Sequence, residues 1–296
     1  MSENKLIEIR CNPSNPVNYL ACCGIFDLVS RMDTAALGRW EMQGDICFVV
    51  ETSVSDEELV ATLVEALSNI DRWRFIGRGD SGDSNDLSLL EVSFQPTSRP
   101  GFTVRVDWWY ETLKSDGRID NKSSWKMYAG NQSVKQILKE RLIPGCLALH
   151  ETDKILSIQP LLDASRPIEG RFGFDPRASR NALDRGYSPN DLHLPVETYP
   201  FAELLGMFGA ASFFPQRLGK AGTLESTRGW VSDPSAAFAY SLWADPLPVT
   251  LARASANRAS RSWSDGVRLL SERAHRKNYS NLTLARPSTI IGGSRD

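Results

Sequence analysis

Alternating apolar and polar positions predict a strand and a helix at the start of the chain. Residues 5–11 (KLIEIRC) have the alternation of a short strand. A helix is expected over 15–32, because Asn15 is a favourable N-cap and Pro16 suits the first helical position. Gly24 lies inside this helix, where glycine lowers helical stability. We therefore expect another element to pack closely against it.

A second strand and helix follow in the same order. Residues 46–52 (ICFVVET) predict a buried strand. Ser55 and Glu58 form a capping box ahead of an amphipathic pattern, which predicts a helix over 56–70. The chain therefore opens with a repeated strand and helix.

The rest of the chain carries weaker periodicity. A helix that precedes Pro144-Gly145 is expected to stop there, because proline interrupts helical hydrogen bonding. Strands are predicted at 87–94, 102–109 and 238–243, and helices at 131–143, 200–211 and 264–277, the last of them basic.

This order of elements is typical of an α+β protein. The nearest simple architecture is a ferredoxin-like or RRM-like core elaborated by insertions, with a helical C-terminal part. Three regions are predicted: an N-terminal α+β region at 1–113, an α+β region with a long irregular Arg/aromatic segment at 114–250, and a basic helical tail at 251–296.

Charge is unevenly distributed, although the net charge is only −2. Residues 251–296 contain nine Lys or Arg and three Asp or Glu, so this tail is +6 and the rest is −8. This asymmetry permits a basic contact surface, and it fits a solvated arginine-rich tail equally well.

The five cysteines do not predict a disulfide framework, because their number is odd and their spacing irregular. No CxxC pair is present, which argues against a zinc ribbon. Cys22 and Cys23 lie in an apolar run, which favours buried packing over a redox or metal role. Without a signal-peptide or transmembrane pattern, the protein is expected in the cytoplasm.

Catalytic patterns are scarce. The sequence has no phosphate-binding loop and no GxSxG elbow, and its three histidines are far apart. We therefore expect no catalytic residue, no metal and no cofactor. The alternative is a metal-dependent nuclease or RNA-processing enzyme whose acids meet in space; its candidate residues are Asp107, Glu111, Asp175, Asp184 and His193.

Arginine and aromatic residues interleave between positions 171 and 191, where Phe172 and Phe174 accompany the arginines. Guanidinium groups grip phosphates, aromatic faces stack on bases, and amides pair with base edges. The candidate nucleic-acid contacts are Lys126, Gln132, Arg171, Arg177, Arg180, Arg185, Tyr187, Asn190, Arg258, Arg261 and Arg268.

A structural interpretation of the same residues stays open. Arg177 and Arg180 could pair with Asp175 and Asp184. The three tryptophans between residues 108 and 125 are expected in the core rather than as stacking platforms.

Several blocks resemble a CRISPR-associated subunit family of the subtype I-U (I-G) effector complex, which is large-subunit-like. The resemblance spans roughly residues 5–250, and the blocks occur in the family's order. They are NPSNPVNYLACCGIFDLVSRM (12–32), DWW (107–109), YAGNQS (128–133), FDPRASRNALDRGYSPN (174–190) and YPFAELLGMFGAASFFP (199–215).

The resemblance implies a non-catalytic subunit of a type I CRISPR effector in antiviral defence. Its implied partners are crRNA, target DNA, a Cas-seven-like backbone and a Cas-five/six-like subunit, with a helicase-nuclease recruited separately. PAM or duplex recognition would fit such a subunit, since base pairing to the guide reads the remaining sequence. A subunit that only bridges proteins is a further alternative.

Overall fold

The computed structural model describes most of the chain. The described residues are 4–77, 88–109, 112–113, 119–120, 125, 127–128, 132–178, 196–213, 230–231, 237–257, 267–276 and 279–287.

The N-terminal sheet is a split β-α-β unit. Strand β3 (Cys47–Thr52) lies between β1 (Lys5–Arg10) and β2 (Leu37–Glu41), and it is antiparallel to both. The outer strands therefore run parallel, and helix α1 (Pro16–Met32) connects them. The predicted bounds of β1, α1 and β3 agree with the structure to within two residues, whereas strand β2 was not predicted. Asn15 caps α1 by accepting the backbone N–H of Val17.

The second sheet separates this protein from a complete ferredoxin-like fold. After helix α2 (Asp56–Ser68), β4 (Trp73–Gly77) pairs with β5 (Ser88–Phe94), which pairs with β6 (Phe102–Val106). In a ferredoxin-like fold the strand after α2 would instead join the edge of β1. The α+β class is confirmed, whereas only the first half of the predicted ferredoxin-like or RRM-like core is present in the described parts of the chain.

The C-terminal part is mainly β, so the prediction of a helix at 264–277 is wrong. Strand β13 (Arg268–Arg276) pairs with β12 (Ala237–Ser241) on one side and with β14 (Tyr279–Leu282) and β15 (Arg286–Pro287) on the other. Pairing on both sides overrides the weak helical pattern of this basic segment. The tail predicted to be helical, 251–296, contains one described helical stretch, which is the part of α8 (Val249–Asn257) that lies beyond residue 250.

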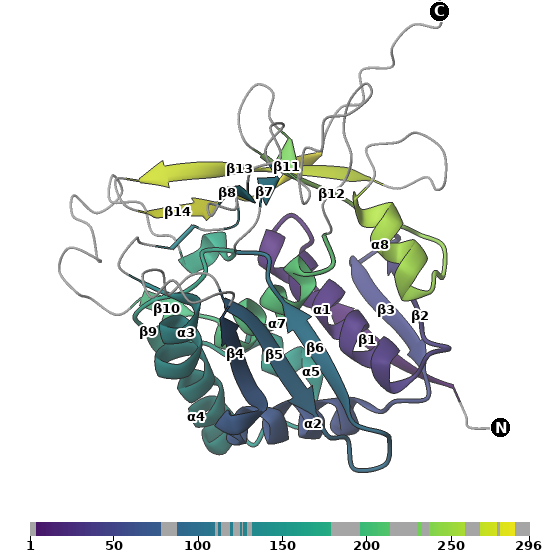
Figure 1. Ribbon diagram of the computed structural model, residues 1–296. Helices are drawn as coiled ribbons and strands as arrows, with labels where there is room; N and C mark the ends of the chain where they lie inside the picture. Colours follow the sequence, from purple (N-terminus) through teal and green to yellow (C-terminus); the bar gives the residue numbers. More distant parts are fainter. Residues whose placement is uncertain are drawn as a thin grey trace, which may run out of the picture.

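The remaining helices and strands complete the fold (Figure 1). They are η1 (Ile70–Arg72), β7 (Thr112–Leu113), β8 (Ile119–Asp120), α3 (Val134–Gln136), η2 (Ile137–Leu142), α4 (Ile143–Asp153), α5 (Ile158–Asp163), β9 (Arg166–Ile168), η3 (Pro176–Ala178), β10 (Val196–Thr198), α7 (Pro200–Ala210) and β11 (Trp230–Val231).

The helix predicted to stop at Pro144 continues to Asp153. Elements α3, η2 and α4 follow one another without a break, and η2 is a π-helical turn in which Ile143 N–H donates to Leu138 O, five residues back. Proline lacks an N–H, and its ring clashes with the carbonyl four residues earlier in a regular α-helix. The wider turn removes that conflict.

Helices α1 and α7 pack backbone against backbone at the centre of the molecule (Figure 1). A Cβ atom added to Gly24 would lie 2.1 Å from the carbonyl oxygen of Leu205, and one added to Gly209 would lie 1.8 Å from that of Leu20. The close neighbour expected at Gly24 is therefore confirmed, and it is α7. All 11 residues of α7 are buried.

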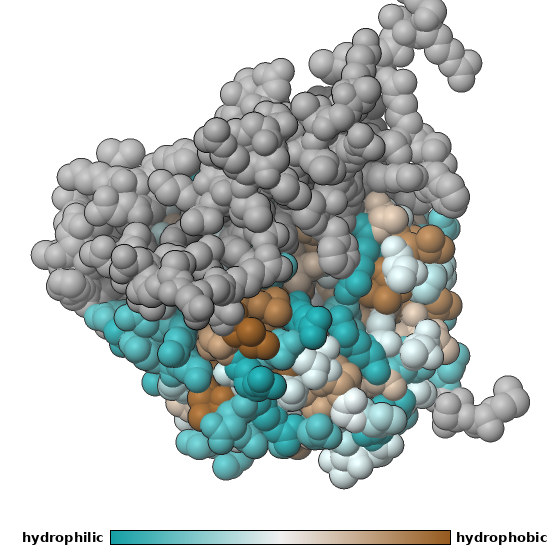
Figure 2. Space-filling view, in the orientation of Figure 1, coloured by the Kyte–Doolittle hydropathy of each residue, from teal (hydrophilic) through white to brown (hydrophobic). Residues whose placement is uncertain are grey.

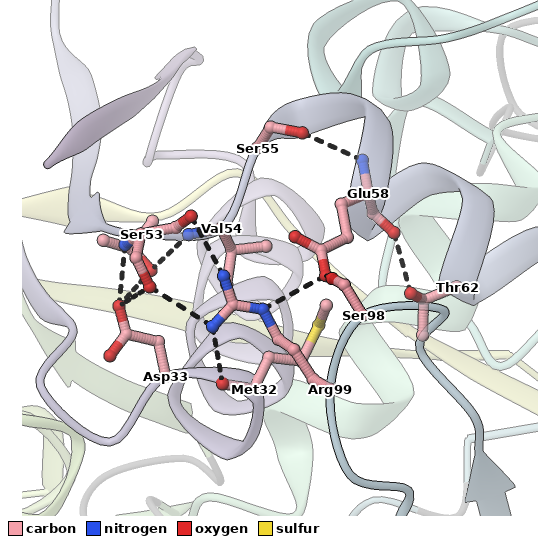
Figure 3. A network of polar contacts seen from close by, with 10 residues as sticks. Met32, Asp33, Ser53, Val54, Ser55, Glu58, Thr62, Ser98 and Arg99 are labelled. Carbon is pink, nitrogen blue, oxygen red and sulfur yellow. Dashed lines mark hydrogen bonds and ion pairs between the residues drawn. The ribbon is translucent and has the colours of Figure 1, made fainter. Parts of the chain in front are cut away.

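An arginine network fastens the β5–β6 hairpin to the N-terminal unit (Figure 3). Arg99 donates to the carbonyl oxygens of Met32 and Ser53 and pairs with Glu58 at 3.1 Å. Asp33 accepts hydrogen bonds from the backbone and the hydroxyl of Ser53 at 2.7 and 2.8 Å. The ends of α1 and β3 and the start of α2 thus meet at one polar cluster.

Among the coloured residues in Figure 2, hydrophilic side chains are interrupted by separate small apolar spots. Exposed large apolar side chains of the described residues are Leu6, Ile46, Ile70, Leu156, Leu251, Val267 and Leu284. None of the helices within the described ranges is long and apolar enough to cross a membrane.

The helix crossing predicts a strong position dependence for glycine substitution in α7. Gly209→Ala should lower the free energy of unfolding by roughly 3 kcal/mol, because the added methyl collides with the backbone of α1. Gly206→Ala is the matched control, since its methyl would meet the side chain of Val17 at 3.3 Å, which can adjust. Urea unfolding of both variants measures the difference; equal stabilities would contradict this packing.

Asp33 should support the fold against acid. Burial raises the pKa of its carboxyl, but hydrogen bonds from Ser53, Thr52 and Ala35 outweigh it and lower the pKa from 3.8 to about 2. The stabilisation that the ionised Asp33 carboxylate provides is complete above pH 3.8 and is lost as the pH falls through 2. Asp33→Asn should therefore be less stable than wild type at neutral pH, and the difference should shrink toward pH 2 in acid-unfolding measurements. A difference independent of pH would argue against these hydrogen bonds.

Candidate nucleic-acid interface

The start of the Arg/aromatic segment is the loop between β9 and η3, which we call the Gly170 loop. Gly170 and Gly173 have φ angles of +83° and +91°, which favour glycine. A Cβ atom on Gly173 would also lie 2.9 Å from the carbonyl oxygen of Ser280 in β14. Leu282 N–H donates to the carbonyl oxygen of Gly173 at 3.1 Å, so β14 fixes the loop from outside.

Phe172 and Phe174 anchor this loop in the core, and both are fully buried. Their rings lie 5.3 and 5.1 Å from the ring of Trp108, whose Nε1–H donates to the carbonyl oxygen of Met207. Neither phenylalanine can stack on a base, which corrects the expectation for these two rings. The prediction of buried tryptophans is confirmed, because Trp108, Trp109 and Trp125 are all inside.

Two buried carboxylates lie beneath the loop. Asp175 and Glu203 each have no exposed surface. The two oxygens of Glu203 accept the backbone N–H groups of Phe172 and Asp175, at 3.1 and 3.0 Å. Asn15, the N-cap of α1, donates its amide to Asp175 at 3.1 Å. These hydrogen bonds join the loop to α1 through Asn15 and to α7 through Glu203.

Arg177 balances the charge of Asp175. Its Nε and Nη2 donate to the Asp175 carboxylate at 3.0 and 2.9 Å, and its guanidinium carbon lies 3.6 Å from the ring centroid of Tyr199. The interpretation in which Arg177 pairs internally with Asp175 is confirmed. About a third of the Arg177 side chain, 34%, stays exposed.

Glu203 titrates near neutrality. Burial raises the pKa of its carboxyl, and the negative charge of Asp175 raises it further. The positive charge of Arg171 and the two backbone donors lower it, and the result is a rise from 4.5 to about 7. The charge beneath the loop therefore depends on pH in the neutral range.

Gly170 of this loop lies beside one predicted contact, Gln132, and one residue that the sequence analysis did not identify, Arg141. A Cβ atom on Gly170 would lie 3.2 Å from Nε2 of Gln132 and 3.7 Å from Cγ of Arg141, and Arg171 follows directly in the chain. We call Gln132, Arg141 and Arg171 the Gly170 rim. Arg141 pairs with Glu169 at 3.7 Å, and its side chain is 45% exposed.

The other predicted contacts are elsewhere or undescribed. Arg268 opens β13 in the C-terminal sheet, opposite Ser241 of β12. The remaining candidates lie outside the described residues: Lys126, Arg180, Arg185, Tyr187, Asn190, Arg258 and Arg261.

The acids of the nuclease alternative are not gathered within the described ranges. Both oxygens of Asp175 are occupied by Asn15 and Arg177. Asp107 is half-buried, while Glu111, Asp184 and His193 lie outside the described residues. Among the residues whose placement is described, no group of three or more His, Cys, Asp or Glu could hold a metal ion.

The sequence analysis did not identify Glu203 or Arg141 as site residues, and of the two only Glu203 has a recognisable sequence signal. Glu203 is the one charged residue of PFAELLGMFGA, and a lone carboxylate in an apolar helix marks a buried polar contact. Arg141 left no such signal, because its place in the rim depends on the π-helical turn before Pro144.

Comparisons of the chain with protein-family models, curated proteins and solved structures gave no match.

Glu203 generates a prediction about stability and pH. Its folded pKa is raised, so the stabilisation from burying the neutral acid is complete below pH 4.5 and lost as the pH rises through 7. Relative to Glu203→Gln, wild type should lose stability across this interval. Denaturant unfolding of both proteins at several pH values measures the difference, and parallel profiles would contradict the raised pKa.

Proposed function

We propose that this chain is a non-catalytic subunit of a type I CRISPR RNA-guided effector complex that contacts crRNA or target DNA through the Gly170 rim. The resemblance of five blocks across residues 5–250 to a subtype I-U (I-G) subunit family motivates the assignment. The partners in this proposal are a Cas-seven-like backbone and a Cas-five/six-like subunit in the cytoplasm, with a helicase-nuclease recruited separately. PAM or duplex recognition is the role proposed within that complex.

The observation that carries the proposal is the placement of polar side chains around Gly170. Gln132, from a loop, and Arg141, from η2, lie beside Gly170, and Arg171 is the next residue in the chain. Guanidinium groups donate in a fork that matches phosphate oxygens, and the amide can both donate and accept. This combination suits a nucleic-acid backbone with an adjacent base or sugar edge.

The frame beneath the rim supports this use. Phe172 is inserted in the core one residue after Arg171, and the N–H of Phe172 is held by Glu203. The backbone that carries Arg171 therefore loses little further conformational freedom when a ligand binds. Arg177 has a different role in the proposal: it orders the loop through Asp175 and Tyr199 and offers its exposed part to solvent.

Removal of rim charge should weaken nucleic-acid binding and its salt dependence. In the assembled complex, Arg141→Gln with Arg171→Gln should flatten the plot of log affinity against log salt by roughly 1.5, at about 0.7–0.9 for each phosphate that the variant no longer neutralises. Binding of labelled single-stranded and duplex DNA, measured across a salt series, gives the slope. Retained bound crRNA, measured after purification, tests the RNA side.

Arg105→Gln is the matched control. Arg105 is 72% exposed on β6 and pairs with Glu91 of the neighbouring strand β5. Both strands belong to the β4–β5–β6 sheet, which does not include the Gly170 loop. This variant should leave the slope unchanged. If the rim variant assembles and unfolds like wild type and keeps the full salt slope, the rim does not bind phosphates and the assignment of this surface is wrong.

A further inference from the structure

Two free thiols meet beside the N-terminal turn. Cys11 follows β1 and is partly exposed, whereas Cys22 lies on α1 and is fully buried. Their sulfur atoms are 3.7 Å apart. This is a contact distance between two thiols, and the sulfurs would need to approach to about 2 Å to form a disulfide.

The pair brackets the turn on which several parts of the fold converge. Residues 12–15 lie between Cys11 and the start of α1. Tyr240 Oη donates to the carbonyl oxygen of Pro13 at 2.7 Å, and Ala285 N–H donates to that of Ser14 at 2.7 Å. Asn15 caps α1 and holds Asp175. A covalent link from Cys11 to Cys22 would therefore restrain the turn that joins α1, the C-terminal strands and the Gly170 loop.

We propose that Cys11 and Cys22 are a redox modification site, at which a peroxide-class oxidant converts the two thiols into a disulfide. The sulfur of Cys11 attacks one oxygen of hydrogen peroxide, the O–O bond breaks, and hydroxide leaves as water with the thiol proton. The sulfur of Cys22 then attacks the sulfenic sulfur of Cys11, the S–O bond breaks, and the second water leaves. Two thiols lose two electrons and two protons, and one peroxide is reduced to two waters.

The order of these steps follows from exposure. Cys11 is reached first, because Cys22 has no exposed surface. Burial, with contributions from Cys11, Cys23 and Cys47, raises the pKa of the Cys22 thiol well above its ordinary value. The thiolate is the attacking species, so closure of the disulfide is slow at neutral pH and accelerates as the pH rises.

Cys47 is the competing partner for Cys11. It stands opposite Arg10 in the β1–β3 pairing, and Cys11 N–H donates to the carbonyl oxygen of its neighbour Ile46. The sulfur of Cys11 nonetheless contacts the sulfur of Cys22. Cys146 is fully buried in α4 and serves as an internal reference thiol.

Peptide mapping of the native wild-type protein tests the proposal without any substitution. The intact chain is treated with hydrogen peroxide, remaining thiols are alkylated under denaturing conditions, and the digest is analysed without reduction. The expected product has a mass about 2 Da lower and links the Cys11 and Cys22 peptides, while Cys146 is fully alkylated. Its rate of formation should increase with pH.

A second measurement reports the restraint itself. The crosslink should raise Tm by on the order of 5 °C, an increase that a reductant reverses and that Cys11→Ser abolishes. Exclusive linkage of Cys11 to Cys47, oxidation of Cys11 to sulfinic acid without any crosslink, or no reaction in the folded protein would each overturn the proposal.

Discussion

The fold depends on the contact between the backbones of α1 and α7. Gly24 and Gly209 leave no room for a side chain between the helices, since an added Cβ would collide with a carbonyl oxygen of the facing helix. Close approach of this kind maximises dispersion contacts along both helices, and all of α7 is consequently buried. The position of α7 in turn places Glu203 beneath the Gly170 loop. The indole N–H of Trp108 donates a hydrogen bond to the Met207 carbonyl oxygen of the same helix.

A buried polar cluster between α1, α7 and the Gly170 loop holds the loop in one conformation. Glu203 binds the loop through two backbone N–H groups, and Asp175 joins the cap of α1 to Arg177. Buried carboxylates are costly unless every oxygen is satisfied, so a cluster of this kind admits few alternative loop conformations. The backbone next to Arg171 is held by this cluster, because Glu203 accepts the N–H of the following residue, Phe172.

Local patterns in the sequence predicted the elements whose signals are contained in one segment. The Asn15 cap, the Ser55 cap and the strand predicted at 102–109 correspond to elements that the structure contains. Non-local pairing could not be predicted in this way. β13 is a strand because β12 and β14 flank it, and β4 joins β5 rather than β1. The internal partner of Arg177 was foreseen as one of two alternatives, whereas Arg141 reaches the rim only through a π-helical turn.

The proposed role requires that nucleic acid touches the Gly170 rim in the assembled complex. A cryo-EM map of the chain with its co-purifying subunits, crRNA and target DNA tests that requirement most directly. The account predicts phosphate density within hydrogen-bonding distance of Arg171, with the loop held by Glu203 as it is here. A map in which this rim faces solvent or another protein, while nucleic acid runs along a different face of the chain, would contradict it.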